Sequence, residues 1–279
     1  MPAKFFNDYL FAKKTLSLLT HFDVKKILLP DMSILVFGNI NLSAQKLEAL
    51  PNLSNVRLFG DFSCAHNRLK DLLGAPMTVR GSFDCSNNML LSLTGAPVYV
   101  RGDFCCDINS LPGLTGAPAT VNGKFSCLHN FMSTLDGAPR YIGSTFDCSA
   151  NFIVSLQGAP EYIGADFICS NNQLRTLQGI SKVIKGALYC EHNRLESFSC
   201  DIRELGEDIF CSSNQLHDLG GLPRRINGRI YCEDNPIDAF KSLPRSYWSI
   251  HTDFGAFAGS AASTFIQGQP LEVPAFLFF

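Results

Sequence analysis

Eleven cysteines are the first residues of this 279-residue chain that could do chemistry. Thiols bind metals, form disulfides and act as nucleophiles. Nine of them recur at intervals of 21 residues: Cys64, Cys85, Cys106, Cys127, Cys148, Cys169, Cys190, Cys211 and Cys232. No Cys-x2-Cys pair and no Cys2His2 spacing accompanies them, which argues against a zinc site. Side chains stacked on parallel strands suit disulfides poorly, so the spacing favours a column of buried, reduced thiols.

Three histidines occupy one shared position of the same period: His66, His129 and His192. Each lies 63 residues from the next. That interval corresponds to three strands, or roughly 14 Å at the usual strand spacing. One metal ion cannot bridge such a distance, and we expect the three side chains to be exposed to solvent.

Two further groups have residue types that could be catalytic. Glu191 and Glu233 lie two repeats apart with Ser212 between them. Their separation of roughly 10 Å is too wide for a retaining glycosidase and marginal for an inverting one. Cys200 and Asp201 lie where other repeats carry Gly-Ala-Pro, which indicates sequence drift. No Walker loop, His-Glu-x-x-His or Gly-x-Ser-x-Gly motif is present, so we predict no catalytic residue, metal site, cofactor or enzymatic activity.

The cysteines belong to a repeat that also keeps an asparagine and a large apolar residue in phase. The asparagine follows by three positions, at Asn67, Asn88, Asn109, Asn130, Asn151, Asn172, Asn193, Asn214 and Asn235. The apolar residue precedes by two positions, at Phe62, Phe83, Phe104, Phe125, Phe146, Phe167, Leu188, Ile209 and Ile230. A constant period of this length predicts a solenoid, whose units bury their apolar faces by stacking.

The residue pattern within one unit predicts a short strand followed by a turn and an irregular return path. Phe83 and Cys85 are two positions apart, so both point inward from an extended strand, whereas Asp84 points to the polar side. Asn88 follows at the turn, where its amide can satisfy backbone groups of its own coil and of the neighbouring one. The return path of about eight to ten residues is shorter than a typical helix, so we expect extended or 3-10 backbone there.

The repeat divides the chain into three predicted regions. Residues 1–35 form an N-terminal cap, since the apolar residues between 3 and 20 have helical spacing; binding to a membrane surface is the alternative role for this helix. Residues 36–246 form a solenoid of about ten repeats. Residues 247–279 form a C-terminal cap and tail, with a degenerate closing unit around 247–254 and an aromatic end that the sequence leaves unassigned.

The repeat resembles that of a known family. Phe-x-Cys-x-x-Asn-x-Leu occupies the place of the Leu-x-Leu-x-x-Asn-x-Leu signature of leucine-rich repeats, with Phe and Cys replacing the usual strand residues. The Leu-x-Gly-Ala-Pro that follows resembles the Leu-Pro-x-Leu-Pro segment of short bacterial repeats, most closely from Leu219 to Pro223. Over about residues 36–246 the chain resembles the bacterial leucine-rich-repeat effectors of the YopM and IpaH type, which Gram-negative pathogens inject into host cells.

This resemblance implies a curved, right-handed coil with a parallel β-sheet on its concave face. It also implies a non-enzymatic module that binds a partner protein on that face, as a secreted virulence effector or adaptor. The ubiquitin-ligase domain of IpaH-type members needs a few hundred residues beyond the repeats, and only 39 follow Phe240, so we expect no such domain. Similar repeats also occur in phage and other bacterial proteins. A structural or self-assembling repeat protein is therefore the alternative, and a repeat-based enzyme a more distant one.

The composition limits the classes of partner and the cellular compartment that we expect. The net charge is −2 and no Lys/Arg run exists to follow phosphates, which disfavours nucleic-acid binding. No apolar stretch reaches 18 residues, and charged residues interrupt any signal-peptide pattern, so we expect neither a transmembrane segment nor a cleavable signal. Eleven thiols favour a reducing intracellular compartment, which under the resemblance is the host cytosol. The oligomeric state stays open.

The outward positions between the phenylalanine and cysteine columns change character along the array. They are mostly small or acidic in the first half and then become Ile168, Tyr189, Phe210 and Tyr231. The charged residues expected beside them are Asp166, Glu191, Asp208, Arg229 and Glu233. Aromatic anchors within a polar rim are typical of protein interfaces, so these nine residues predict a site for a protein or peptide partner that carries basic groups. Two alternatives remain: rings that only strengthen the sheet, or a site for sugars or small ligands.

Overall fold

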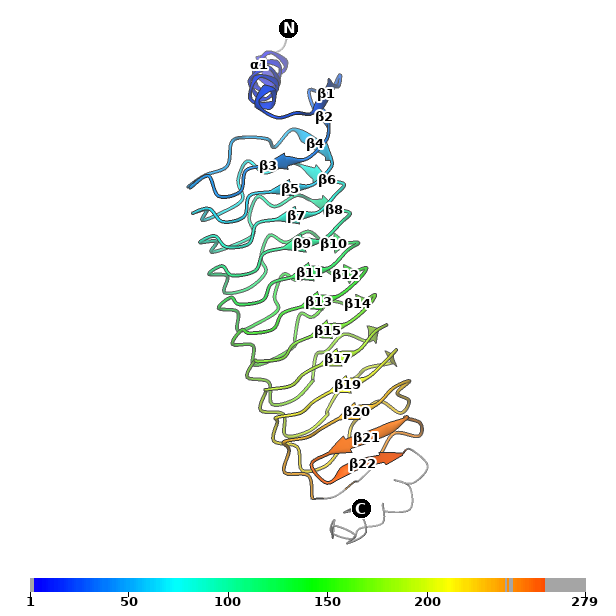
Figure 1. Cartoon of the computed structure of the whole chain (residues 1–279). Helices are drawn as coiled ribbons and strands as arrows, with labels where there is room; N and C mark the ends of the chain where they lie inside the picture. The colour runs from blue at the N-terminus through cyan, green and yellow to red at the C-terminus, as the bar shows by residue number, and fades with distance from the viewer. Residues whose placement is uncertain (1–2, 239, 241–242, 259–279) are drawn as a thin grey trace. The chain divides into compact units, whose positions relative to one another are not determined.

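The computed structural model describes residues 3–238, 240 and 243–258. The chain forms two compact units (Figure 1). Unit 1 comprises Met1–Phe131 and Asp136–Gly143, and unit 2 comprises Met132–Leu135 and Ser144–Phe279. The fold is a β-solenoid of about ten turns with parallel strands, preceded by one helix, and matches the predicted leucine-rich-repeat architecture.

A typical coil carries two short strands. In β8 (Tyr99–Val100) the valine points inward, and in β9 (Phe104–Cys105) the phenylalanine does. Gly102 lies between the two strands. A Cβ there would lie 2.7 Å from the backbone carbonyl group of Gly81, one coil earlier, so only glycine allows the coils to approach so closely at this bend.

Equivalent strands pair in register and parallel, which gives two kinds of sheet, here named the valine sheet and the phenylalanine sheet. The valine sheet of unit 1 contains β2 (Ile34–Phe37), β4 (Val56–Phe59), β6 (Thr78–Val79), β8, β10 (Thr120–Val121) and β12 (Tyr141–Ile142). Its phenylalanine sheet contains β3 (Ile40–Asn41), β5 (Phe62–Ser63), β7 (Phe83–Asp84), β9 and β11 (Phe125–Ser126). The sequence predicted only the phenylalanine sheet, and it treated the Val79 position as part of the return path.

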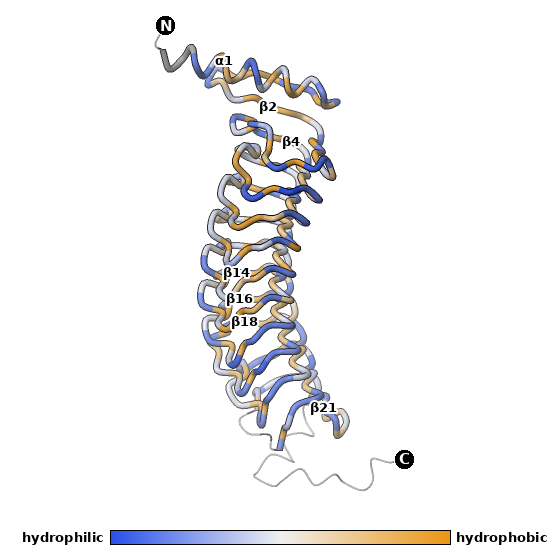
Figure 2. Tube along the Cα trace, turned by 90° about the vertical axis from the view of Figure 1, so that its left-hand side faces the viewer, coloured by the Kyte–Doolittle hydropathy of each residue, from blue (hydrophilic) through white to orange (hydrophobic). Residues whose placement is uncertain are grey.

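Unit 2 repeats this arrangement. Its valine sheet contains β14 (Tyr162–Ile163), β16 (Val183–Ile184) and β18 (Glu204–Leu205). Its phenylalanine sheet contains β13 (Phe146–Asp147), β15 (Phe167–Ile168), β17 (Leu188–Tyr189), β19 (Ile209–Phe210), β20 (Ile230–Tyr231), β21 (Ser249–Thr252) and β22 (Gly255–Ala258). In each unit, hydrophobic segments recur at the same place in successive coils (Figure 2).

The predicted columns form the core. Phe83 and Phe104 stack with ring centroids 5.2 Å apart, and both side chains are fully buried. The cysteines of the column are likewise buried, and the thiol of Cys85 donates a hydrogen bond to the backbone oxygen of Cys105 at 3.2 Å. Among the described residues no cysteine forms a disulfide. The thiols therefore act as small core residues, as predicted.

The asparagines form the predicted ladder, as Asn109 illustrates. Its Nδ2 donates to the backbone oxygens of Cys106 at 3.1 Å and Asp107 at 3.2 Å in its own coil. The same nitrogen donates to the oxygen of Cys85 in the preceding coil at 3.2 Å. Its Oδ1 accepts from the N–H of Leu90 at 3.0 Å, also one coil earlier. Each amide thus serves its own turn and that of its neighbour.

The turn before each asparagine needs left-handed backbone. His66, His129 and His192 have φ of 57°, 52° and 52°, and all three side chains are exposed, as expected. Asparagine, aspartate and histidine tolerate this conformation better than most residues. The shared histidine position therefore has a backbone reason. In the described residues, the return path that follows contains turns and bends rather than helix.

Each end of the chain adds elements outside the repeat. Helix α1 (Ala3–Leu18) confirms the predicted helix, and a 3-10 turn, η1 (Leu19–His21), follows it. Strand β1 (Lys25–Leu28) then pairs antiparallel with β2, which was not predicted. In unit 2, β21 and β22 form a second antiparallel hairpin. The end that the sequence left unassigned begins at Gly255: its first four residues form β22, and the residues from 259 onward lie outside the described residues.

Candidate functional site

The outward residues of the phenylalanine sheet in unit 2 form one continuous row on neighbouring strands. Strand pairing places Ile168 beside Tyr189, Tyr189 beside Phe210, and Phe210 beside Tyr231. Strand β21 adds His251 beside Tyr231. We call these five residues the aromatic column. All five side chains are half-buried.

The rings of the aromatic column stack face to face. Tyr189 and Phe210 have centroids 4.5 Å apart and an interplanar angle of 2°, and Phe210 and Tyr231 follow at 4.7 Å and 1°. His251 continues the stack at 4.6 Å and 22° from Tyr231. The sequence did not predict His251, because its coil has lost the cysteine and is shorter by one residue: 20 residues separate it from Tyr231, instead of 21.

This stacking determines which parts of the rings a ligand can contact. The faces of Phe210 and Tyr231 are covered by neighbouring rings, so their edges point towards solvent. The edge of an aromatic ring carries partial positive charge, whereas the face carries partial negative charge. The column therefore presents apolar edges that suit carbonyl oxygens and aliphatic groups, and its inner rings leave no face for a cation.

Two of the predicted acidic residues also support the backbone. The Oδ1 of Asp166 accepts from the N–H of Ala187 at 2.9 Å, and that of Asp208 accepts from the N–H of Arg229 at 2.7 Å. Each carboxylate thus caps the next coil at the bend between the two strands. They contribute negative charge beside the column while their positions are fixed by the fold.

The other predicted charged residues lie against the column as well. Glu191 accepts a hydrogen bond from the hydroxyl of Ser170 at 3.0 Å, and Glu233 accepts one from Ser212 at 2.8 Å. Arg229 donates from Nη1 to the hydroxyl oxygen of Tyr231 at 3.3 Å. Serine thus holds each glutamate to the preceding coil, and Glu191 lies near enough to Tyr189 to act on it electrostatically.

The electrostatics of the site are dominated by carboxylates. Partial burial raises the pKa of Tyr189, and the negative charges of Asp166 and Glu191 raise it further. Glu207 and Asp208 act in the same direction. Glu207 was not among the predicted residues, because it stands where most coils carry glycine at the bend. We call the carboxylates of Asp166, Glu191, Glu207, Asp208 and Glu233 the acidic rim.

The equivalent positions in unit 1 differ. Ser63, Asp84, Cys105 and Ser126 occupy the outward row there. Asp84 turns back on its own strand, where its Oδ1 accepts from the N–H of Ser86 at 3.0 Å. Ser63, Asp84 and Cys105 are partly exposed, whereas Ser126 is fully buried, and none of the four carries an aromatic side chain. The aromatic column is therefore a local feature of unit 2.

The remaining groups that the sequence singled out for possible chemistry have structural surroundings in the described residues. The thiol of Cys200 donates to the backbone oxygen of Gly221 at 3.4 Å, and burial raises its pKa, which disfavours the nucleophilic thiolate. No group of three or more His, Cys, Asp or Glu side chains in the described part of the chain is placed to hold a metal ion. No described helix has the length and apolarity needed to cross a bilayer.

Comparisons with known proteins add little to this picture. No protein-family model matches the sequence, and no curated protein matches it either. Among solved structures, the chain is similar to YopM from Yersinia enterocolitica WA-314, with a TM-score of 0.35 and 17% sequence identity. The match covers 77% of this chain and 65% of the YopM chain, so it spans less than two thirds of that chain's length. The repeat architecture therefore rests on the two sheets and the asparagine ladder described above.

Proposed function

We propose that this protein is a non-enzymatic binding module that holds a protein or peptide partner on the outer face of the phenylalanine sheet in unit 2. The aromatic column carries the proposal. Four consecutive strands there present Tyr189, Phe210, Tyr231 and His251 in place of small polar residues. Half-buried rings that become fully desolvated by a partner are typical anchors of protein interfaces.

The surroundings of the column define the chemistry of the partner. Five carboxylates form the acidic rim, and Arg229 is the one basic residue of the predicted set, engaged with Tyr231. A partner with lysine or arginine side chains therefore complements the rim. The exposed ring edges suit the carbonyl oxygens and aliphatic stems of that partner. A basic, extended peptide segment combines both properties.

The biological setting of this binding rests on the repeat motif alone. Leucine-rich-repeat effectors of the YopM and IpaH type share the Asn-x-Leu turn and the short unit, so we include in the proposal an effector or adaptor role in a host cell. The same resemblance leads us to propose three further features. They are a right-handed coil, a concave position for the phenylalanine sheet and a reducing cellular compartment.

Self-assembly through strand edges is the alternative for a repeat protein. Exposed strand edges promote such assembly. Unit 1 carries the β1–β2 hairpin and unit 2 the β21–β22 hairpin at a sheet edge. The outer strands of these hairpins, β1 and β22, are themselves sheet edges, so self-assembly stays the alternative to partner binding through the aromatic column.

The test compares the wild-type chain with Tyr189→Ala/Phe210→Ala/Tyr231→Ala in a quantitative pull-down from host-cell lysate. A matched control, Phe152→Ala/Val154→Ala, removes two exposed apolar side chains from the turn of another coil. Partners that the control retains and the triple variant loses support the proposal. If a triple variant with a native circular dichroism spectrum keeps every partner, the column only strengthens the sheet. If it unfolds, Glu191→Lys/Glu233→Lys is used instead, and undiminished capture of basic partners contradicts the proposal.

A further inference from the structure

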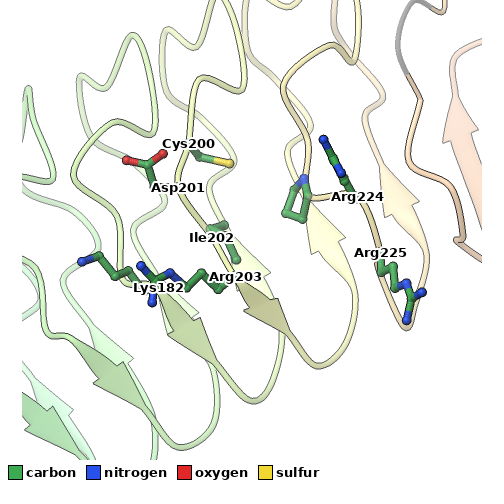
Figure 3. Close-up of a pocket in the computed structure, with 8 residues that line it drawn as sticks. Lys182, Cys200, Asp201, Ile202, Arg203, Arg224 and Arg225 are labelled. Carbon is green, nitrogen blue, oxygen red and sulfur yellow. The ribbon is translucent and has the colours of Figure 1, made fainter.

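A cavity of about 700 Å³ opens on unit 2 away from the aromatic column (Figure 3). It lies beside the valine sheet, in the segments that lead into the strands of successive coils. Its lining residues are Lys182, Cys200, Asp201, Ile202, Arg203, Pro223, Arg224 and Arg225. Binding sites for small molecules fall roughly between 300 and 1,000 Å³, so this volume suits a compact ligand.

The cavity opens where one coil departs from the regular turn. Neighbouring coils have glycine at the equivalent position, with φ of 86° at Gly179 and 92° at Gly221. A Cβ on Gly179 would lie 2.7 Å from the backbone of the coil before it, so the regular turns stack tightly. Cys200 replaces this glycine. The chain forms a turn at 178–179 and at 220–221, but it forms none at 199–202.

Basic residues from three consecutive coils line the cavity. Lys182, Arg203 and Arg224 share one position of the 21-residue period. The N–H of Arg203 donates to the oxygen of Lys182 at 2.9 Å, which places these two on adjacent coils. Figure 3 shows the side chains of Lys182 and Arg203 beside each other, while Arg224 and Arg225 lie on the next coil and point in different directions. The sequence contains no run of basic residues. The fold, rather than the order of residues along the chain, places these charges around one cavity.

These charges are not neutralised within the described residues. Four cations and one carboxylate, Asp201, line the cavity, which leaves a net charge of +3. Glu204, the neighbour of Arg203 in the chain, is hydrogen-bonded to Lys185 at 2.5 Å. None of the four lining cations has a carboxylate partner within 4.0 Å in the part of the chain that the structure describes. Like charges on neighbouring strands repel each other, so their clustering calls for an anion.

We propose that this cavity binds a small organic ligand that carries at least two phosphate groups. A phosphate ester bears a charge of about −1.5 to −2 near neutral pH, so two groups match the excess charge of the lining. The arginine side chains offer planar forks for phosphate oxygens, and Lys182 offers a compact charge. Ile202 and Pro223 supply apolar contacts for the organic part. This site is independent of the aromatic column.

The concave shape argues for a small ligand rather than a nucleic-acid strand. A strand needs a row of cations along an open surface and aromatic residues on which bases can stack. The eight lining residues include no aromatic side chain. Binding of a polymer is therefore an outcome that the experiment distinguishes.

The experiment uses isothermal titration calorimetry on the full chain with inorganic phosphate and pyrophosphate as probes. We expect pyrophosphate to bind at least about tenfold more tightly than phosphate, because it engages cations from more than one coil. Arg203→Gln/Arg224→Gln should weaken pyrophosphate binding by at least about tenfold. The matched control, Arg175→Gln/Arg194→Gln, removes two exposed arginines of unit 2 outside the cavity and should leave the affinity unchanged.

Several results would overturn the proposal. Equal pyrophosphate affinities for the wild type and the cavity variant would do so, as would an equal loss in the control. Binding of heparin or single-stranded DNA without binding of pyrophosphate would assign the charge cluster to polymers instead. Thermal unfolding monitors the fold of each variant. If the double variant unfolds, the exposed Lys182→Gln is tested alone, and unchanged affinity contradicts the proposal.

Discussion

Tyr189 and Phe210 lie on adjacent strands with their ring centroids 4.5 Å apart and their planes within 2° of parallel. The strand pairing that joins them is the same that stacks Leu188 on Ile209 in the core. The outer and inner faces of the phenylalanine sheet therefore share one register. A single parallel ladder positions both the core and the candidate partner-binding surface.

The first prediction concerns the coupling between these two rings. Stacked aromatic pairs contribute about 0.5–1.5 kcal/mol beyond the area they bury. A double-mutant cycle with Tyr189→Ala and Phe210→Ala, measured by urea unfolding, should give a coupling energy in this range. The same cycle with Tyr189→Ala and Phe254→Ala, a residue in the turn of the closing hairpin, should give additive losses. Additivity in both cycles would show that the stack contributes nothing to stability.

The second prediction concerns the asparagine ladder. Asn109→Ala removes four hydrogen bonds to backbone groups that stay buried, so it should lower the free energy of unfolding by about 1–3 kcal/mol. Asn109→Asp should cost more, because a carboxylate would face three carbonyl oxygens that now accept from Nδ2. Urea unfolding of both variants at pH 7 is the measurement. An aspartate variant as stable as the wild type would contradict the ladder.

Much of the core could be predicted because its residues have an unambiguous physical role at a fixed spacing. Phe104 and Cys106 lie two apart and both point inward, and Asn109 follows where the strand ends. Phenylalanine, cysteine and asparagine recur together every 21 residues, and a stack of coils is the arrangement that buries all three. The same reasoning predicted the row that includes Tyr189, since an outward position follows from the inward ones.

The features that were missed depend on properties that a linear pattern does not contain. Tyr99 and Val100 form a strand of the valine sheet because Gly102 lets neighbouring coils approach, and this depends on space rather than on alternation. The left-handed turn at His129 is set by backbone geometry. Arg203 and Arg224 line one cavity only because their coils are adjacent. Reading residues down the 21-residue columns, instead of along the chain, would have revealed this last cluster.

The third prediction concerns glycine in the turn. Gly116 has φ of 93°, and a Cβ there would lie 2.6 Å from the backbone of Leu93. Gly116→Ala should therefore cost roughly 2–5 kcal/mol, through backbone strain and overpacking together. Gly255 has φ of 117° but open space around it, so Gly255→Ala should cost only the strain, roughly 1–2 kcal/mol. Equal losses in thermal or urea unfolding would mean that contact between coils is not the constraint.

The fourth prediction concerns the reactivity of the thiols. Only Cys105 and Cys200 are partly exposed, whereas the other cysteines are buried. Burial also raises the pKa of Cys105 to about 12, so even this thiol is mostly protonated at pH 8. A chromogenic disulfide reagent should label at most these two residues in the native protein, and slowly. All eleven should react after denaturation without reductant. Rapid native labelling of further cysteines, identified by mass spectrometry, would contradict the buried column.

The last prediction is a loss of stability at alkaline pH. Burial raises the pKa of thiols such as Cys85, Cys148 and Cys211 well above the value of 9.0 expected in the unfolded chain. Because the folded pKa is the higher one, the stability linked to these neutral thiols is fully present below pH 9. This stability is lost as the pH rises from 9 towards the pKa values of the thiols in the folded protein, since only the unfolded chain releases these protons. Each buried thiol should lower the free energy of unfolding by about 1.4 kcal/mol per pH unit in that window.

Urea unfolding between pH 8 and 10.5 measures this loss, and one variant isolates the share of a single thiol. Cys148→Ala should be less stable than the wild type at pH 8, but its stability should fall less steeply by about 1.4 kcal/mol per pH unit above pH 9. Met132→Ala, which removes a buried side chain without a thiol, should be destabilised equally at every pH. Parallel curves for the wild type and Cys148→Ala would show that Cys148 ionises in the folded protein as readily as in the unfolded one, because water reaches its thiol.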